Sequence, residues 1–154
     1  MGTISGSSGV DLLQVTGSDF GLSGGGGNDL LLGAGSDDWL NGGKGNDWLV
    51  GGDGDDRLIG GKGNDNMSGG DGADTFVFGK NSGKDVIVDY DGTSDFLQIS
   101  KTKTIKKIAD VIKHAKVHGD DLVITLGKGQ TITLKDTTKA ELKAAADDGH
   151  IKIV

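Results

Sequence analysis

The chain contains no cysteine and no proline among its 154 residues. The absence of cysteine excludes disulfide bonds and thiol chemistry. It does not assign the protein to the cytosol, because a bound metal can stabilise a small secreted fold in place of disulfides. There is no N-terminal apolar stretch of the signal-peptide type, and no apolar run approaches membrane-spanning length. Met1 and Gly2 are typical of an added start, so we expect the chain to be part of a longer protein.

In contrast to proline, glycine is abundant, and the chain contains 30 glycine residues. Such a composition is typical of disordered or collagen-like chains. The sequence lacks the three-residue period of collagen, and its apolar residues recur at regular intervals. We therefore expect an ordered fold that uses glycine for its backbone conformations.

Charge is divided unevenly along the chain, whose net charge is −7. Residues 1–100 contain sixteen Asp, no Glu and five Lys or Arg, whereas residues 101–154 carry a net charge of +4. An acidic block is often a solvated, disordered tail. Here most of the Asp residues recur at one fixed offset beside an apolar column, which favours a structural role. An acidic surface also disfavours nucleic acid as a partner.

A nine-residue period runs without slippage over residues 6–77. Six strong blocks cover residues 24–77, and they read GGGGNDLLL, GAGSDDWLN, GGKGNDWLV, GGDGDDRLI, GGKGNDNMS and GGDGADTFV. Two weaker blocks precede them in the same register, GSSGVDLLQ and VTGSDFGLS. A fixed period of this kind is the signature of a repeat architecture.

The columns of the repeat indicate its structure. The first position is Gly in seven of the eight blocks and the fourth is Gly in six. The eighth position is always apolar: Leu13, Leu22, Leu31, Leu40, Leu49, Leu58, Met67 and Phe76. Each block therefore predicts a glycine-rich turn and a three-residue strand whose middle side chain points inward. Two blocks form one coil of 18 residues with a strand on each side, which predicts a fold dominated by β-structure.

The sixth position indicates a calcium site. It is Asp in seven blocks: Asp11, Asp29, Asp38, Asp47, Asp56, Asp65 and Asp74. Stacked coils place each Asp above the one 18 residues earlier, roughly 4.8 Å away, where the carboxylates repel one another unless a cation lies between them. Calcium accepts six to eight oxygen ligands in flexible geometry, and turn carbonyls can supply the remaining oxygens. Counting stacked pairs predicts about five core calcium ions, with one or two more at the ends.

On these blocks the chain resembles the RTX repeat family, the calcium-binding nonapeptide repeats of secreted toxins and enzymes. The resemblance implies a right-handed parallel β-roll that folds on calcium, near the C-terminus of a protein exported by type I secretion to the cell surface or beyond. It also implies that the seven sixth-position Asp residues are the carboxylate ligands. Phe20 departs from the pattern in the second block, where the neighbouring Asp19 is a possible substitute.

Beyond Val77 the period ends. Residues 85–90 and 95–99 alternate as strands and are similar to the last rungs that follow RTX repeats. Asp85, Asp89, Asp91 and Asp95 are either further ligands at the end of the roll or surface residues beside turns. We therefore divide the chain into a roll over residues 1–100 and a C-terminal α+β cap over residues 101–154.

Within the cap, residues 104–118 have the apolar spacing of an amphipathic helix, with Thr104 as N-cap and Gly119 as stop. His114 and His118 are spaced for a transition metal on such a helix, but no third ligand is evident, and His118 also suits the helix dipole. Residues 122–134 predict a β-hairpin, and residues 138–141 form a capping box that opens a short helix. Asp147 and Asp148 before an apolar terminus resemble a type I export signal, which is compatible with a final capping strand.

No constellation of catalytic residues is present, so we expect this chain not to be an enzyme, although a catalytic domain upstream is possible. One function is a calcium-driven module for folding and type I export. The alternative is an extracellular binding or adhesion module that recognises a polysaccharide or host surface through exposed apolar and aromatic positions. Leu30, Leu32, Trp48 and Val50 form an outward apolar patch. We expect the cap to cover it and to leave Trp39 more exposed than Trp48.

Overall fold

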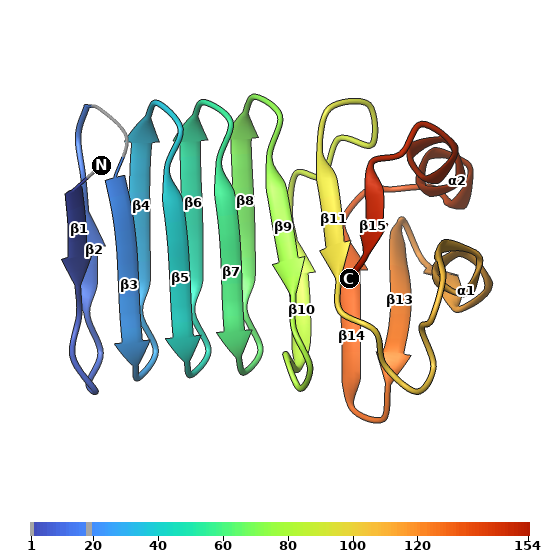
Figure 1. Ribbon diagram of the computed structural model, residues 1–154, viewed down its shortest axis with the longest axis horizontal. Helices are drawn as coiled ribbons and strands as arrows, with labels where there is room; N and C mark the ends of the chain where they lie inside the picture. The colour runs from blue at the N-terminus through green and yellow to red at the C-terminus, as the bar shows by residue number, and fades with distance from the viewer. Residues whose placement is uncertain (1, 18–19) are drawn as a thin grey trace.

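Each block of the repeat contributes one strand, and successive strands alternate between two sheets. The structure, a computed structural model, describes residues 2–17 and 20–154. The two sheets face each other along the long axis as a parallel β-solenoid (Figure 1). The first sheet has seven strands in the order β1 (Gly2–Ser5), β3 (Phe20–Gly26), β5 (Trp39–Lys44), β7 (Arg57–Lys62), β9 (Thr75–Phe78), β11 (Phe96–Ile99) and β15 (Ile151–Ile153).

The second sheet has eight strands. Their order is β2 (Leu12–Gln14), β4 (Leu30–Gly35), β6 (Trp48–Asp53), β8 (Asn66–Asp71), β10 (Lys84–Ile87), β14 (Gln130–Leu134), β13 (Asp121–Gly127) and β12 (Ala115–His118). Within the repeats every strand pairs in parallel with the strand 18 residues away, for example Leu31 with Leu49. We call each pair of consecutive strands a rung. The predicted coil of two blocks is confirmed.

The strands of the strong repeats are longer than the three residues that the pattern predicts. Strands β4 to β8 each have six residues and continue from the seventh position of one block to the third position of the next. The paired glycines therefore join the ladder, with Gly43 opposite Gly25 and Gly61. Gly43 has φ +102°, a conformation that other residues resist. The three-residue prediction was wrong because it assigned these glycines to the turn.

The eighth-position column forms a narrow core between the two sheets. Leu22, Leu31, Leu40, Leu49, Leu58 and Phe76 are fully buried. The same apolar cluster continues beyond the repeats through Ile87 and Leu97 to Leu134 and Ile151. One core therefore runs from the first rungs into residues 101–154.

The C-terminal region extends both sheets beyond the repeats. As predicted, β10 pairs with β8 and β11 pairs with β9 as further rungs. Strand β14 then adds in parallel to β10, and β15 adds in parallel to β11. The predicted hairpin is formed by β13 and β14, and the Thr138 capping box opens α2 (Lys139–Asp147). Within the described residues, no helix has the length and apolar character needed to cross a membrane.

The helix predicted for residues 104–118 is mostly wrong. Only α1 (Ile108–Lys113) is helical, and its N-cap is Lys107 rather than Thr104. Residues 115–118 form β12, which pairs antiparallel with β13 across a turn that contains Gly119 at φ +66°. Sheet pairing overrides the helical spacing here, because the local pattern carries no information about β13.

The expected cover over the apolar patch is also wrong. The cap continues the sheets at one end of the roll, and both helices lie at that end, away from β4 and β6 (Figure 1). Trp48 is therefore 52% exposed, while Leu30, Leu32 and Val50 are partly exposed. Trp39 is the less exposed tryptophan because it lies in the first sheet between Gly21 and Arg57.

The two tryptophans should differ in access to solvent. In the calcium-loaded protein we expect acrylamide to quench Trp48 more efficiently than Trp39. Fluorescence of the Trp39→Phe and Trp48→Phe variants separates the two signals. Stronger quenching of Trp39 would contradict the placement of the cap at the end of the roll.

Candidate metal centre

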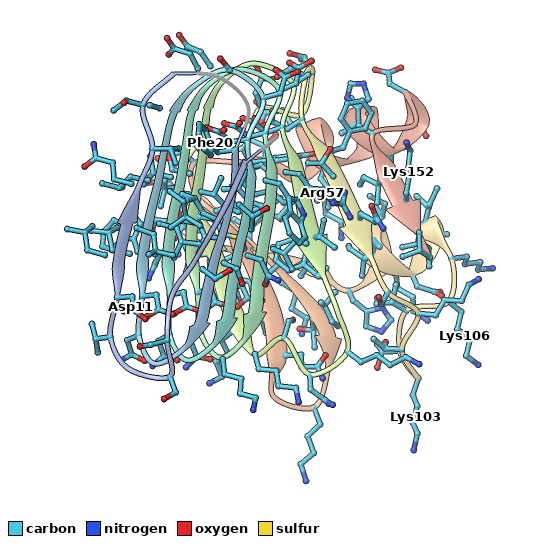
Figure 2. The ribbon with its side chains drawn as sticks, turned by 60° about the vertical axis from the view of Figure 1, so that its left-hand side comes forward. Asp11, Phe20, Arg57, Lys103, Lys106 and Lys152 are labelled. Atoms are coloured by element: carbon cyan, nitrogen blue, oxygen red, sulfur yellow. The ribbon has the colours of Figure 1, made fainter. Side chains whose placement is uncertain are left out.

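The sixth-position aspartates form two hydrogen-bonded columns, one along each edge of the roll. Asp11 and Phe20, the sixth-position residues of the first two blocks, lie at opposite edges (Figure 2). In the first column, Oδ1 of Asp47 accepts the backbone N–H of Asp29 at 2.8 Å, and Oδ1 of Asp65 accepts that of Asp47 at 2.8 Å. In the second, Oδ1 of Asp56 accepts the backbone N–H of Asp38 at 2.7 Å. Each carboxylate thus binds the rung before it. The structure therefore brings the predicted residues together in the two expected columns.

The columns continue past the repeats. Oδ1 of Asp85 accepts the backbone N–H of Asp65, and Oδ1 of Asp95 accepts that of Asp74, both at 3.1 Å. Their spacings of 20 and 21 residues show that loops can lengthen without breaking a column. Asp89 and Asp91 lie outside the columns. Asp89 accepts bonds from the backbone of Gly69 and Gly70, and Asp91 accepts bonds from Thr93.

The first rungs differ from the rest. Asp11 is only partly buried, and its Oδ2 accepts bonds from the backbone N–H and the hydroxyl of Ser7. The backbone N–H of Phe20 donates to Oδ1 of Asp38, so the second column starts at Asp38. Asp19, the suggested substitute, lies outside the described residues.

The second carboxylate oxygen marks where a cation fits. Among the described residues, Oδ2 has no hydrogen-bond partner and is buried in the following residues: Asp29, Asp47, Asp56, Asp65 and Asp74. It faces the first-position glycine of its own block. A Cβ on Gly24 would collide with Oδ2 of Asp29 and would lie 2.6 Å from the carbonyl oxygen of Gly42. Carboxylate and carbonyl oxygens therefore converge on a space that only glycine leaves open, a donor set suited to calcium.

Burial perturbs these carboxyl groups strongly. Desolvation raises the pKa of Asp56 to about 7 and that of Asp65 and Asp74 to about 6. The backbone hydrogen bond that each carboxylate accepts lowers its pKa in part, and neighbouring carboxylates raise it again. Asp85, in the added rung, behaves in the same way with a pKa of about 7. The ionised form that binds metal is thus unfavourable in the folded protein without a cation.

A second ladder, formed by the fifth position, was missed by the sequence analysis. Oδ1 of Asn46 accepts the backbone N–H of Asn64 at 2.8 Å, and Oδ1 of Asp37 accepts that of Asp55 at 2.9 Å. These bonds run to the following rung, opposite in direction to those of the sixth position. The signal was the column of short Asn and Asp side chains: Asn28, Asp37, Asn46, Asp55 and Asn64.

The two edges of the roll carry opposite charges. The lysine edge, with turns at residues 24–29, 42–47, 60–65 and 79–85, presents exposed Lys44, Lys62, Lys80 and Lys84, and its carboxylates are buried. The acidic edge, with turns at residues 33–38, 51–56, 69–74 and 88–95, presents exposed aspartates. These are Asp37, Asp53, Asp55, Asp71, Asp89 and Asp91. The alternation of third and fifth positions between blocks causes this segregation.

The histidine pair is not arranged as the helical spacing suggested. His114 ends α1 and its Nδ1 lies 2.8 Å from the carbonyl oxygen of Asp110, whereas His118 is in β12. In the described part of the chain, no three His, Cys, Asp or Glu side chains gather as a metal cluster.

Comparison with known proteins identifies the repeats. The family described as RTX calcium-binding nonapeptide repeat (4 copies) matches residues 22–49 and 41–76. Residues 22–76 of the roll are RTX calcium-binding repeats. RTX repeats bind calcium and are typical of type I secreted proteins. Which atoms of this RTX roll bind the ions stays a prediction.

Two solved structures are similar to this chain. The extracellular lipase LipA from Serratia marcescens is 18% identical, with a TM-score of 0.53, and the match covers all of this chain and 40% of the lipase. A subunit of the mannuronan epimerase of Azotobacter vinelandii is 26% identical with a TM-score of 0.49, and the match covers 95% of this chain and 79% of that one. No curated protein sequence is significantly similar. The lipase supports the fold alone, and this chain spans well under half of its length.

One variant separates the charge of the column from its hydrogen bonds. Asp47→Asn keeps an oxygen that can accept the Asp29 N–H but removes the negative charge. We expect the calcium concentration at the folding midpoint to rise about tenfold or more, because ligand charge sets calcium affinity. The matched Asp11→Asn variant, at the partly exposed end of the same column, should shift it much less. Equal shifts in a calcium titration followed by circular dichroism would contradict the arrangement.

Acid should stabilise the metal-free fold. The folded-state pKa values of about 6 to 7 lie above the ordinary value of 3.8, so the folded protein binds more protons than the unfolded chain. This stabilisation is fully present below the ordinary value and is lost as the pH rises through 6 to 7. We therefore expect more β-structure in chelator at pH 5 than at pH 7.5. With calcium present, protons compete for the carboxylates, so the calcium midpoint should rise as the pH falls through the same window.

Proposed function

We propose that this chain is a calcium-driven folding module of a larger exported protein. It remains largely disordered where calcium is scarce and folds into the roll where calcium is abundant. When bound, calcium supplies the positive charge and the oxygen coordination that the stacked carboxylates need. We further propose about five core ions between stacked aspartates, with one or two more at the ends.

The observation that carries this proposal is the set of buried carboxylate oxygens without hydrogen-bond partners. An isolated buried charge costs several kcal/mol even after relaxation, and the roll repeats this cost at each of the three rungs that start with Asp29, Asp47 and Asp65. The core opposes it with only one apolar side chain per strand of the repeat. Folding without a cation is therefore unfavourable near neutral pH, and cation binding is coupled to folding.

Protein export is a process in which calcium-dependent folding would be useful. Type I secretion passes an unfolded chain out of the cell, and the lower calcium inside would keep the repeats unfolded until they emerge. RTX repeats are typical of proteins that leave by this route. We propose the secretion machinery as a partner and the extracellular space or cell surface as the destination. The paired β15 is a capping strand in the folded state, and residues 147–154 serve as export signal before folding.

We also propose that the chain itself has no catalytic activity and that any activity belongs to another domain of the longer protein. The absence of a catalytic motif in the sequence supports this assignment. The size of the similar lipase, of which this chain spans 40%, is compatible with a further domain.

A calcium titration tests the folding proposal. In chelator at pH 7.5 we expect a far-ultraviolet circular dichroism spectrum dominated by disorder, with a cooperative change to β-structure on addition of millimolar calcium. Magnesium at the same concentration serves as the control, because its smaller ion demands stricter octahedral geometry. A spectrum that is identical in chelator and in calcium would overturn the proposal.

The exposed apolar patch favours a second candidate, an extracellular binding or adhesion module. Leu12 is 66% exposed and Trp48 52% exposed, and both lie in one cross-strand row with Leu30. Exposed aromatic and aliphatic side chains on a flat sheet suit a polysaccharide or a host surface. The folding proposal needs only the columns, so the two functions are compatible.

A further inference from the structure

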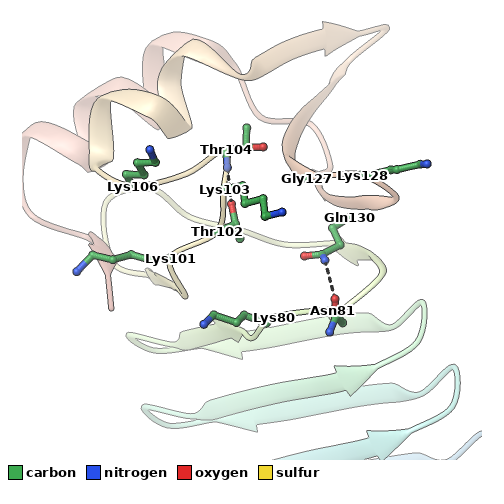
Figure 3. A pocket seen from close by; sticks show the side chains of 10 residues that line it. All are labelled: Lys80, Asn81, Lys101, Thr102, Lys103, Thr104, Lys106, Gly127, Lys128 and Gln130. Atoms are coloured by element: carbon green, nitrogen blue, oxygen red, sulfur yellow. Dashed lines mark hydrogen bonds between the residues drawn. The ribbon is translucent and has the colours of Figure 1, made fainter.

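A large cavity lies at the junction of the roll and the C-terminal region. Its volume is about 850 Å³, and its lining includes five lysines from three segments of the chain: Lys80, Lys101, Lys103, Lys106 and Lys128 (Figure 3). No lining residue in the described part of the chain is acidic. Like charges that converge on one concave surface are unfavourable in the free protein and focus a positive potential.

These lysines are not used to stabilise the fold. Among the described residues, the one salt bridge joins Lys135 to Asp121, away from the cavity. The nearest carboxylate in sequence, Asp110, accepts the backbone N–H groups of Lys106 and Lys107 at the start of α1. All five lysines are exposed. Their positive charge is therefore available to a ligand.

The cavity walls are held in place by neutral hydrogen bonds. The Thr102 hydroxyl accepts the backbone N–H groups of Thr104 and Ile105 and donates to the carbonyl of Leu126 at 2.6 Å. Nε2 of Gln130 donates to Oδ1 of Asn81 at 3.4 Å, which links β14 to the loop after β9 (Figure 3). The segments that carry the lysines are thus tied together before any ligand arrives.

The positive surface continues along the lysine edge of the roll. Lys44 and Lys62 are register partners on adjacent strands, about 4.8 Å apart along the sheet, and Lys80 lies on the same edge at the mouth of the cavity. The fifth position on this edge is Asn at residues 28, 46 and 64 instead of the Asp found on the acidic edge. A ligand with several spaced negative charges therefore matches this surface better than a single ion.

The side-chain types narrow the ligand chemistry. Among the residues that the structure describes, no aromatic side chain lines the cavity, so it offers the bases of single-stranded nucleic acid no stacking partner. The single arginine, Arg57, lies in β7 and donates to Gln98, so the cavity offers no guanidinium for bidentate contacts to either a phosphate or a carboxylate. Lysines beside Thr104, Asn81 and Gln130 instead offer ammonium groups for carboxylates and neutral polar groups for hydroxyls.

From these observations we infer that the cavity and the adjoining lysine edge bind an acidic polysaccharide that carries carboxylates on successive sugars. This site is separate from the apolar patch and from the aspartate columns. Binding depends on the folded state but not on which residues hold calcium. The acidic edge on the opposite side orients the molecule so that only one edge approaches such a polymer.

The test uses the full chain, folded at the lowest sufficient calcium concentration, and an oligogalacturonate of eight sugars as probe. The Lys101→Glu/Lys103→Glu variant removes cavity charge, and Lys116→Glu/Lys143→Glu is the matched control at exposed positions outside the cavity. By calorimetry we expect the cavity variant to lose affinity about tenfold or more and the control to stay within about twofold. Both variants should keep the wild-type calcium midpoint, which separates this result from a failure of folding.

Four further measurements bear on the ligand. Affinity should fall as salt is raised, and the fully methyl-esterified oligomer should bind much more weakly, because the contacts are charged. Equal loss in both lysine variants, or no binding at low salt, would overturn the site. Inorganic tripolyphosphate that binds as tightly as the oligomer would overturn the carbohydrate assignment. Dimerisation in sedimentation velocity that is abolished by the cavity variant would assign the surface to the acidic edge of a second copy.

Discussion

The rest of this roll depends on one constraint, the stacking of buried carboxylates one strand spacing apart in its turns. Each Asp turns one oxygen to the backbone of the preceding rung, and the other faces the Cα of a glycine in its own block. The glycine cannot be replaced without displacing the carboxylate. Within the repeats the core contributes one apolar side chain per strand, so the aspartate columns decide under which conditions the roll exists.

The features set by the period were predictable, and those set by distant pairing were not. Asp29 and Asp47 were placed in one column because 18 residues return the chain to the same point whatever the turn geometry. Residues 115–118 form a strand because they pair with β13. The apolar spacing within these residues contains no information about that pairing, so the helix predicted for them was wrong. The prediction that the cap covers Trp48 rested only on the apolar character of the patch, and Trp48 is exposed. In this protein the last strands extend the sheets and cover neither face.

The fifth and sixth positions together make each rung depend on both neighbours. Asn46 accepts a bond from the rung after it, while Asp47 accepts one from the rung before it. Stability in such a stack is largely a sum of nearest-neighbour terms, so loss of one rung weakens the two beside it. The C-terminal strands complete the series on the side where β10 and β11 would otherwise present open edges. This arrangement favours a cooperative transition along the whole roll.

The alternation of GGKGND and GGDGDD blocks has a consequence for how the repeat can lengthen. Insertion of a single block of nine residues would move every later block to the other side of the roll. If the inserted block followed residues 42–50, Lys62 would move to the edge that carries the exposed aspartates, and Asp53 would lie beside Lys44. Duplication of two blocks leaves both edges as they are. The heritable unit of this protein is therefore the pair of blocks, and its length can grow or shrink in steps of one whole coil while the polarity across the roll is kept.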